Sequence, residues 1–429
     1  MRPGDLVELT VEKGIYRGLG LARAQGRAVF VARGLPGDRV RARVTGVEPG
    51  FARAAIEAVL EPGPERRPGP CPHAAACGGC AYQELDYAAQ LRLKETILQE
   101  SLARAGASWD GPISVTPSPR EAWRTRATFH VATSASGVRV GLREEGSHRV
   151  VALEGCLHVS ESMNRALAGL RLGLERRPAL AARVSHIRLV EAGTPGSVLA
   201  CFEGDLAASD GPPLLGLADG TSLAGLGYLV GPGQRRRYVS LAGEPFVSSD
   251  VLGLRFRVHV QSFFQANRFL VDALARTVRE RTPAGGSVLD LYSGVGLFAL
   301  TLASQAERVL GVEASEWAVE DAKANAEVAG LAKVRFWQAD VVATLARLPA
   351  ERGERVILDP PRTGAGVAVV RGVAAREPEA IVYVSCDPPT LGRDLKALRE
   401  VGYRLASLEL FDLFPDTFHL ESVALILRD

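Results

Sequence analysis

The sequence predicts an α/β protein in which a mainly parallel sheet is accompanied by two β-rich regions. Apolar strand-like runs alternate with helix-like stretches from residue 260 onward. Short alternating runs separated by Gly and Pro turns fill residues 115–258, and similar runs fill residues 1–60. Strand–helix alternation is typical of a sheet with helices on both faces, whereas closely spaced strands and turns are typical of barrels and sandwiches.

The composition is that of an ordinary globular chain. The 429 residues are 47% hydrophobic and 23% charged, with a formal net charge of +2. This length is enough for two or three domains. There is no apolar run of transmembrane length and no secretion-type apolar segment after MRPGDLVELT, so we expect a cytoplasmic protein. A nucleic-acid partner must be identified from local clusters, because the net charge is small.

Residues 1–62 are predicted to form a small closed β-barrel. The runs LVELTV, RAVFV, RVRARVTGV and AAIEAVL alternate apolar and polar positions and are separated by turn signals. Basic side chains in this region suit a polyanion, although a solvated barrel face explains them equally well. The Pro-rich stretch EPGPERRPGP at 61–70 is a stiff linker that marks a domain boundary.

Three cysteines lie within ten residues just after this linker. Cys71, Cys77 and Cys80 occur in CPHAAACGGC, where two glycines allow a turn that brings thiolates to one metal centre. Six cysteines are too few for a disulfide scaffold in a chain of this length, so the clustering indicates metal. The candidates for a fourth ligand are Cys156, Cys201 and His73. Tetrahedral zinc and an iron–sulfur cluster remain equally open on this chemistry.

An amphipathic helix and a mostly β region are predicted next. Apolar positions recur at helical spacing from Tyr87 to Ala105, and Gly106 ends the helix. Further along, WRTRATFHV at 123–131 interleaves aromatic rings with Arg124 and Arg126. This mixture suits stacking on unpaired RNA bases and contact with phosphates, but an edge strand with exposed arginines explains it equally well.

A nucleotide-type cofactor pocket is predicted in the last region. The run SVLD ends at Asp290, and YSGVG then turns into a helix near Leu297. Gly294 and Gly296 let the backbone approach a ligand at the helix N-terminus. Glu313 ends the next strand, where a carboxylate can accept both hydroxyls of a ribose.

Two further observations bear on this pocket. Asp340 ends FWQAD and could bind an adenine amino group, although a helix N-cap before VVATLARL is an alternative. The run GVGLFA also fits the relaxed dinucleotide pattern, so an NAD-dependent oxidoreductase is a competing interpretation.

The run ILDPPR separates classes of target more clearly. Asp359 ends a strand there, and two prolines fix a rigid loop at the carboxyl edge of the sheet. Enzymes that methylate exocyclic amines follow such prolines with an aromatic residue, whereas this chain has Arg362. An amino-group target is therefore disfavoured.

Cys386 and Glu421 are the candidate catalytic pair. Cys386 follows the apolar run 380–384, which places it at the end of a buried strand beside the pocket. A thiolate that adds to carbon 6 of a pyrimidine makes carbon 5 able to attack a sulfonium methyl group, and a base must then remove the proton from carbon 5. Glu421 precedes an apolar strand and could face the pocket. The alternatives are a core thiol and a solvated carboxylate.

With these segments assembled, the chain resembles the RNA uracil-5 methyltransferase family over nearly its whole length. The resemblance rests on SFFQAN (262–267), DLYSGVGLF (290–298), DPPRTGAG (359–366), VSCDPPTLGRDL (384–395) and DLFPDTFHLESV (412–423). It implies methyl transfer from S-adenosylmethionine to carbon 5 of a uridine, with Cys386 as nucleophile and Glu421 as proton acceptor. The residues that it implies around the cofactor and target base are Gln265, Tyr292, Glu313, Asp340 and Asp359.

The resemblance also implies a division into domains. The barrel (1–62) is similar to the OB-like, RNA-binding TRAM domain. Residues 63–84 and 115–258 correspond to a central iron–sulfur and RNA-recognition domain, and residues 85–114 and 259–429 to a Rossmann-like class I methyltransferase domain.

The cysteine pattern is similar to that of an iron–sulfur-containing 23S rRNA subgroup. Its fourth ligand stands in the position of Cys156, which favours a 4Fe–4S cluster over zinc. Related members carry an arginine-containing segment at 123–131, which favours RNA contact for Arg124 and Arg126. Leu297 stands where family members often have Asn, so we expect one polar cofactor contact to be absent.

Structured RNA is therefore the expected partner, and no obligatory protein partner or membrane is implied. Ribosomal RNA is favoured over transfer RNA, and the target uridine must leave its stack to reach Cys386. The competing classes are the oxidoreductase and a non-catalytic iron–sulfur RNA-binding protein.

Overall fold

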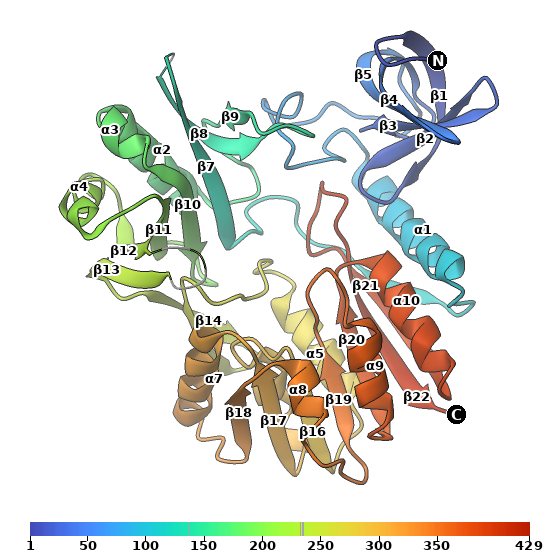
Figure 1. Ribbon diagram of the computed structural model, residues 1–429, viewed down its shortest axis with the longest axis vertical. Coiled ribbons are helices and arrows are strands. Elements are labelled where there is room, and N and C mark those ends of the chain that lie inside the picture. The colour runs from blue at the N-terminus through green and yellow to red at the C-terminus, as the bar shows by residue number, and fades with distance from the viewer. Residues whose placement is uncertain (136, 232, 234–235) are drawn as a thin grey trace.

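The N-terminal strands close into a barrel, as the alternating runs predict. A computed structural model describes residues 1–135, 137–231, 233 and 236–429 (Figure 1). The barrel strands are β1 (Leu6–Ile15), β2 (Leu19–Ala24), β3 (Arg27–Ala32), β4 (Arg39–Glu48) and β5 (Phe51–Glu61), in the order β1-β2-β3-β5-β4. Side chains such as Leu9, Val29 and Val40 alternate inward and fill its core.

Helix α1 (Tyr87–Ala105) supports the barrel from below. Asp86 caps it by accepting hydrogen bonds from the backbone N–H groups of Ala88 and Ala89, and Gly106 ends it with a φ of 81°. The barrel lies directly on this helix: a Cβ added to Gly14 would stand 2.8 Å from Leu93 Cδ1. The predicted helix is confirmed.

The central region is built on a sheet of order β13-β12-β11-β10-β7-β8-β9. Its strands are β7 (Arg126–Ser134), β8 (Gly137–Arg143), β9 (Val150–Ala152), β10 (Val184–Glu191), β11 (Val198–Gly204), β12 (Leu223–Val230) and β13 (Arg237–Gly243). The helices α2 (Glu161–Glu175), α3 (Pro178–Ala181) and α4 (Gly211–Leu215) accompany it, and a hairpin of β14 (Phe246–Val251) and β15 (Leu254–His259) follows.

The last region is a mainly parallel sheet of order β18-β17-β16-β19-β20-β22-β21-β6. Its strands are β6 (Ile113–Thr116), β16 (Ser287–Leu291), β17 (Arg308–Glu313), β18 (Val334–Gln338), β19 (Arg355–Leu358), β20 (Ala380–Ser385), β21 (Tyr403–Phe411) and β22 (Glu421–Arg428). Strand β22 runs antiparallel to both of its neighbours.

Helices cover both faces of this sheet. The helices α5 (Val271–Arg281), α6 (Leu297–Leu302) and α7 (Glu316–Val328) share one apolar core with it. The helices α8 (Val341–Leu345), α9 (Gly366–Ala374) and α10 (Pro388–Arg399) share another, together with α1. The predicted alternation of strands and helices is confirmed.

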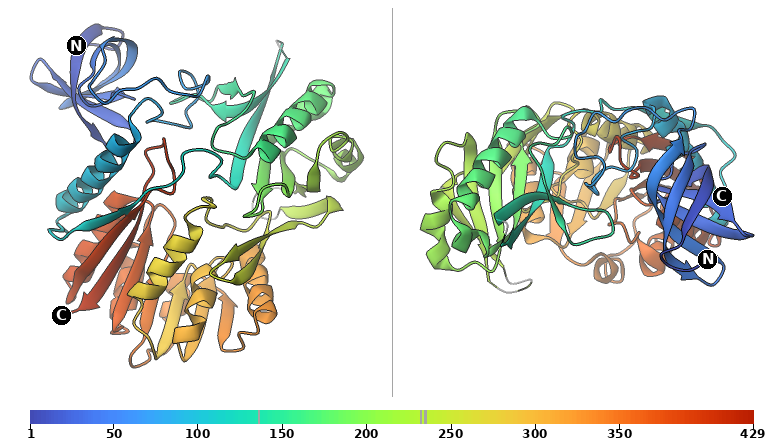
Figure 2. Two further views of the ribbon diagram at one scale, coloured as in Figure 1. Left: turned by 180° about the vertical axis from the view of Figure 1, so that it is seen from behind. Right: turned by 90° about the horizontal axis from the view of Figure 1, so that it is seen from above.

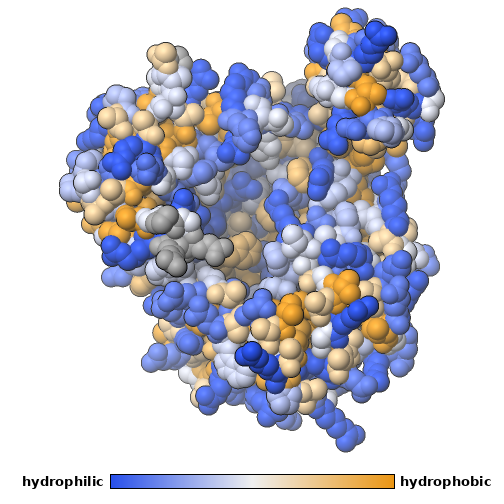
Figure 3. Space-filling model, in the orientation of Figure 1, coloured by the Kyte–Doolittle hydropathy of each residue, from blue (hydrophilic) through white to orange (hydrophobic). Residues whose placement is uncertain are grey.

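The three parts enclose a recess. Seen from above, the barrel and the central sheet lie at opposite ends of the molecule, and the loops of residues 62–86 run between them (Figure 2). The space-filling view shows a hollow between these parts, above the parallel sheet (Figure 3). The loop that joins β21 to β22 rises toward this hollow (Figure 1). In the part of the chain that the structure describes, no helix is long and apolar enough to cross a membrane.

Candidate active site and cysteine cavity

Cys386 stands at the end of a fully buried strand, directly before a helix. Strand β20 ends at Ser385, and Asp387 caps α10 by accepting a hydrogen bond from the backbone N–H of Thr390 at 3.0 Å. The turn that carries the thiol is thus held on both sides by regular structure. The side chain of Cys386 is half-buried rather than enclosed in the core.

Glu421 lies next to this turn because of strand pairing. Ser422 in β22 is paired with Ser385 in β20, so the preceding residue of β22 comes level with the residue that follows β20. Glu421 is 3% exposed. The solvated-carboxylate alternative is therefore wrong.

The charges around the pair act in opposite directions. Burial raises the pKa of Cys386 to about 12, and Glu421 adds to this effect, whereas the cation of Arg362 opposes it. Burial also raises the pKa of Glu421 well above its usual value, and Arg362 again opposes the shift. Burial therefore acts against the charged form of each side chain, and the cation of Arg362 acts in favour of it.

Asp359 and Gln265 extend the site toward the parallel strands. Asp359 follows β19, and its Oδ2 accepts a hydrogen bond from Gln265 Nε2 at 3.5 Å. Burial raises the pKa of Asp359 to about 7, with Glu313 adding to the shift and Gln265 opposing it. The loop after Asp359 is anchored where the N–H of Ala365 donates to Tyr383 Oη at 3.0 Å.

The glycine-rich turn lies at the same edge of the sheet. Tyr292, Gly294 and Gly296 have φ values of 65°, 53° and 88°, and α6 then begins at Leu297. A Cβ added to Gly296 would stand 2.3 Å from Leu300 Cδ1, so the turn requires glycine there. Glu313, which ends β17, accepts a hydrogen bond from the N–H of Gly294 at 3.0 Å.

Asp340 is the N-cap of a helix, which is the alternative to adenine binding that the sequence left open. Its Oδ1 accepts a hydrogen bond from the N–H of Ala343 at 2.9 Å and so caps α8. A contact with adenine stays a prediction.

Asp290 and His419 are site residues that sequence reasoning missed. Asp290 is fully buried; its Oδ2 accepts a hydrogen bond from the N–H of Ala299, and its Oδ1 has no partner among the described residues. Burial, together with Asp359, raises its pKa. His419 Nε2 lies 3.4 Å from Arg362 Nη2, and burial lowers the pKa of His419 to about 3. The contact of His419 with Arg362 and the effect of Asp359 on Asp290 depend on tertiary packing, which spacing does not reveal.

The clustered cysteines share a small cavity. Cys71, Cys77, Cys80 and Cys156 line a space of about 30 Å³, as does His73, whereas Cys201 lies in β11 of the central sheet. The sequence did not identify His158, whose Nδ1 lies 3.8 Å from Cys80 Sγ. Burial raises the pKa of Cys80 to about 12. Among the described residues, no three His, Cys, Asp or Glu side chains meet closely enough to hold a metal ion.

The segment 123–131 requires a correction. Trp123 and Phe129 are fully buried, so the prediction that these rings stack on RNA bases is wrong. The edge-strand alternative is also wrong, because β7 is paired with β10 and β8 on its two sides.

The two arginines of this segment have internal contacts. The guanidinium of Arg124 lies 4.8 Å from the Trp123 ring and borders the cysteine cavity. Arg126 Nη1 donates to the carbonyl of Val260 at 3.0 Å, and burial lowers the pKa of Arg126 to about 9. Contact of either residue with RNA stays a prediction.

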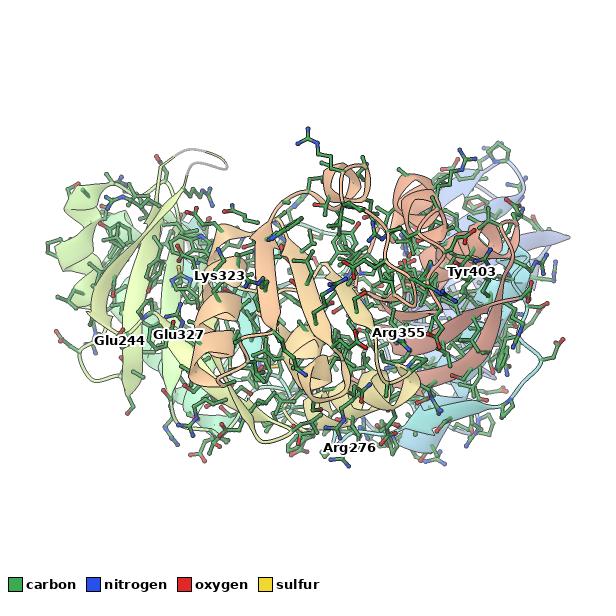
Figure 4. All side chains as sticks on the ribbon, turned by 90° about the horizontal axis from the view of Figure 1, so that it is seen from below. Glu244, Arg276, Lys323, Glu327, Arg355 and Tyr403 are labelled. Carbon is green, nitrogen blue, oxygen red and sulfur yellow. The ribbon has the colours of Figure 1, made fainter. Side chains whose placement is uncertain are left out.

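A larger cavity, of about 530 Å³, lies away from these residues. It is formed by α7 and β18 and is lined by Lys323, Glu327 and Trp337 among others, the first two of which are labelled in Figure 4. The candidate catalytic and cofactor residues do not line it.

Family models and relatives agree with this arrangement. Residues 249–429 match the tRNA (uracil-5-)-methyltransferase model, and residues 2–56 match the TRAM domain. An RNA methyltransferase of Streptomyces coelicolor is 35% identical over 99% of this chain and 93% of that protein. The 23S rRNA (uracil(1939)-C(5))-methyltransferase RlmD of Shewanella amazonensis is 32% identical over 98% of this chain and 95% of that protein.

A solved structure shows the same organisation. The crystal structure of the Pyrococcus abyssi tRNA (uracil-54, C5)-methyltransferase in complex with S-adenosyl-L-homocysteine covers 98% of this chain and 100% of that chain, with a TM-score of 0.77 and 25% identity.

The fold and site define a Rossmann-like, S-adenosylmethionine-dependent methyltransferase with an N-terminal TRAM barrel. The chain belongs to the RNA uracil-5 methyltransferase family, and it is an RNA (uracil-5-)-methyltransferase. The oxidoreductase and the non-catalytic binding protein are thereby set aside.

Proposed function

We propose that the protein methylates carbon 5 of a specific uridine in 23S rRNA through a covalent bond between Cys386 Sγ and carbon 6. The observation that supports this chemistry is the adjacency of Cys386 and Glu421 at the ends of paired strands. Their separation is set by backbone hydrogen bonds, so nucleophile and base are organised before RNA binds.

The proposed reaction uses the two side chains in turn. The Cys386 thiolate forms a bond to carbon 6, and the electron pair of the carbon 5–carbon 6 double bond moves toward the carbon 4 carbonyl. S-adenosylmethionine supplies the methyl group. Carbon 5 uses the enolate pair to form a bond to that methyl carbon while the bond between the methyl carbon and the sulfonium sulfur breaks, so that S-adenosylhomocysteine is released. The Glu421 carboxylate then removes the proton from carbon 5, the double bond re-forms, and the thiolate leaves.

The electrostatics suit these roles. A carboxyl group whose pKa is raised by burial holds a proton well, which is the property that a base at carbon 5 needs. The cation of Arg362 favours the thiolate of Cys386 against the effect of burial. We assign the pocket for cofactor and base to Gln265, Tyr292, Gly294, Gly296, Glu313, Asp340 and Asp359.

RNA containing 5-fluorouridine tests this mechanism. Fluorine at carbon 5 cannot be removed as a proton, so we expect a lasting adduct between protein and RNA that survives denaturing electrophoresis. The adduct should disappear in Cys386→Ala and persist in Cys201→Ala, which removes a thiol from the central sheet. An undiminished adduct in Cys386→Ala contradicts the assignment.

Ribosomal RNA is our proposed substrate. Both relatives align over nearly all of both chains, but the relative named for 23S rRNA is 32% identical to this chain, whereas the solved structure named for tRNA is 25% identical. Mapping of 5-methyluridine in cells with and without the gene tests this choice. Loss of the nucleoside from tRNA with unchanged 23S rRNA would reject it.

We further propose that Cys71, Cys77, Cys80 and Cys156 hold a 4Fe–4S cluster. These side chains border one cavity, together with the cation of Arg124, which favours thiolates. Zinc ligands at about 2.3 Å place their sulfur atoms within about 4 Å of one another, whereas a cuboidal cluster accepts more widely spaced thiolates. Its proposed role is to hold the loops of the RNA surface, because methyl transfer needs no electron.

Metal analysis after anaerobic purification tests this proposal. We expect a brown protein that contains iron and sulfide, and loss of both in Cys156→Ser. Cys201→Ser serves as the control, since that thiol lies in the central sheet. A colourless protein with stoichiometric zinc would reject the cluster.

The parts of the chain divide this work in our proposal. The barrel (1–62) and the central region (63–84 and 115–258) hold structured RNA, with Arg124 and Arg126 near the target strand. The remaining residues (85–114 and 259–429) carry out the chemistry, and we propose the cytoplasm as its site.

A further inference from the structure

A turn of the N-terminal barrel reaches the residue beside the nucleophile. Tyr16 lies between β1 and β2, and its hydroxyl donates a hydrogen bond to Asp387 Oδ2 at 2.6 Å. The two residues are 371 positions apart in the chain. Asp387 directly follows Cys386, and its other oxygen, Oδ1, caps α10. Each oxygen of the Asp387 carboxylate, next to the Cys386 thiol, thus accepts a hydrogen bond: Oδ1 from the start of α10 and Oδ2 from Tyr16.

The same barrel turn also contacts the segment that leads to Glu421. The rings of Tyr16 and Phe418 meet edge to face, with their centroids 6.2 Å apart. Gly18 has a φ of 72°, and a Cβ there would stand 2.6 Å from Ala81 Cβ and 3.5 Å from Phe418 Cβ. This close approach means that the turn is packed in place. It is fixed against both catalytic elements.

We infer that Tyr16 is a positioning residue of the methyltransferase site, by which the RNA-binding barrel holds the turn that carries Cys386. This inference rests on the proposed role of Cys386 as nucleophile. It makes the barrel a structural part of the reaction centre as well as a binding surface.

The charges around the thiol explain why this hydrogen bond matters. The groups that act on Cys386 are Glu421 from β22, Arg362 and Asp359 from the loop after β19, Asp387 from its own turn, and Tyr16 from the barrel. Asp387 disfavours the thiolate, and a donated hydrogen bond withdraws part of its negative charge. Burial, with the help of Asp387, raises the pKa of Tyr16, so its hydroxyl keeps the proton that it donates.

Tyr16→Phe in the full-length protein tests the inference. We expect the pH profile for alkylation of Cys386 by iodoacetamide to shift upward, because Asp387 loses its donor. We also expect the adduct with 5-fluorouridine RNA to form about tenfold more slowly at saturating RNA, with RNA affinity changed less than about twofold. If Tyr16 acts through Asp387, the same substitution should have no further effect in Asp387→Asn.

The control is Tyr403→Phe. Tyr403, which is labelled in Figure 4, is a buried tyrosine at the start of β21, whereas the loop toward Glu421 follows the other end of that strand. Its hydroxyl donates a hydrogen bond to the carbonyl of Pro378 at 3.4 Å. This variant should leave both readouts unchanged. An unchanged alkylation profile in Tyr16→Phe would overturn the inference. Alkylation needs no RNA, so absence of the adduct in the wild type would reject the proposed function separately.

Discussion

The sulfur of Cys386 lies among charges of opposite sign. Burial and Glu421 disfavour its thiolate, whereas Arg362 favours it. A free thiolate would be exposed to oxidation before RNA arrives, since susceptibility follows thiolate character and access. A thiol whose ionisation is disfavoured in the free protein is less prone to this loss.

Glu421→Gln should separate methyl transfer from product release. Glutamine cannot accept the proton from carbon 5, so we expect RNA that is methylated yet still bonded to Cys386. Turnover should fall by about 10²–10⁴-fold, the usual range for loss of a general base. Denaturing electrophoresis with a radiolabelled methyl group would show label in the protein–RNA band. Free methylated RNA at the wild-type rate would exclude this role.

The sequence was sufficient to place Cys386 directly after one apolar strand run and Glu421 at the start of another, and their catalytic roles stay a prediction. It was insufficient for His158 and Tyr16, whose contacts join distant segments, and for Asp290, whose complete burial the sequence does not reveal. It also misplaced Trp123 and Phe129 on the surface, because interleaved aromatic and basic residues look alike in a core strand and in a binding strand.

At the scale of elements, the turn before α6 depends on backbone conformation. Gly294 and Gly296 are followed by a buried Leu297, the position at which the sequence predicts the loss of one polar cofactor contact. We therefore expect the backbone groups at the start of α6 to be the part of this turn that contacts the cofactor.

Gly296→Ala should weaken cofactor binding. Its φ of 88° disfavours a side chain, and the added Cβ would also collide with Leu300 Cδ1 at 2.3 Å and Phe336 Cζ at 2.7 Å. We expect the affinity for S-adenosylhomocysteine, measured by calorimetry, to fall by more than about tenfold. The reason is that the steric clash of the new Cβ adds to the cost of about 1 kcal/mol for a non-glycine residue in the left-handed conformation.

Gly330→Ala is the matched control for that substitution. Its φ of 66° is similarly positive, but a Cβ there meets no atom within 4 Å. It should lower stability slightly and leave cofactor affinity unchanged. Equal losses of affinity in both variants would contradict the packing explanation.

Two elements show the limits of sequence reasoning at this scale. Helix α2 carries Met163, Leu167 and Leu174 at helical spacing behind the cap residue Ser160, so its signal was present within a region predicted as mostly β. Strand β6 is only four residues long and joins β21 of the distant parallel sheet. Nothing in so short a run identifies its partner.

At the scale of the whole molecule, a buried ion pair joins α1 to the segment before Glu421. Lys94 Nζ lies 2.5 Å from Asp412 Oδ1, and both side chains are 0% exposed. Tyr87 Oη donates to the other oxygen of Asp412 at 2.9 Å. Charges buried this deeply are stabilising only while both partners are present.

Lys94→Met should destabilise the fold by about 3–5 kcal/mol, because it leaves the Asp412 carboxylate buried without its cation. Lys13→Met is the control. Lys13 in β1 forms an ion pair at 2.6 Å with Glu100, which lies on α1 as Lys94 does, but the two side chains of this pair are 43% and 31% exposed. It should cost less than about 1 kcal/mol. Urea unfolding of both variants checks this, and equal midpoints would refute it.

The late position of Asp416 in the chain determines when four earlier side chains can form their hydrogen bonds during synthesis. Its carboxylate accepts hydrogen bonds from Gln83, Gln90, Arg120 and His158, which precede it by 333, 326, 296 and 258 residues. At a translation rate of about 5–20 residues per second, roughly 10–70 s pass between the synthesis of these residues and the synthesis of Asp416, their hydrogen-bond acceptor. The segment that carries the clustered cysteines therefore cannot form its final hydrogen bonds early in translation. A cofactor that binds this segment must either bind after Asp416 has been synthesised or be held by a loop that is not yet fixed in place.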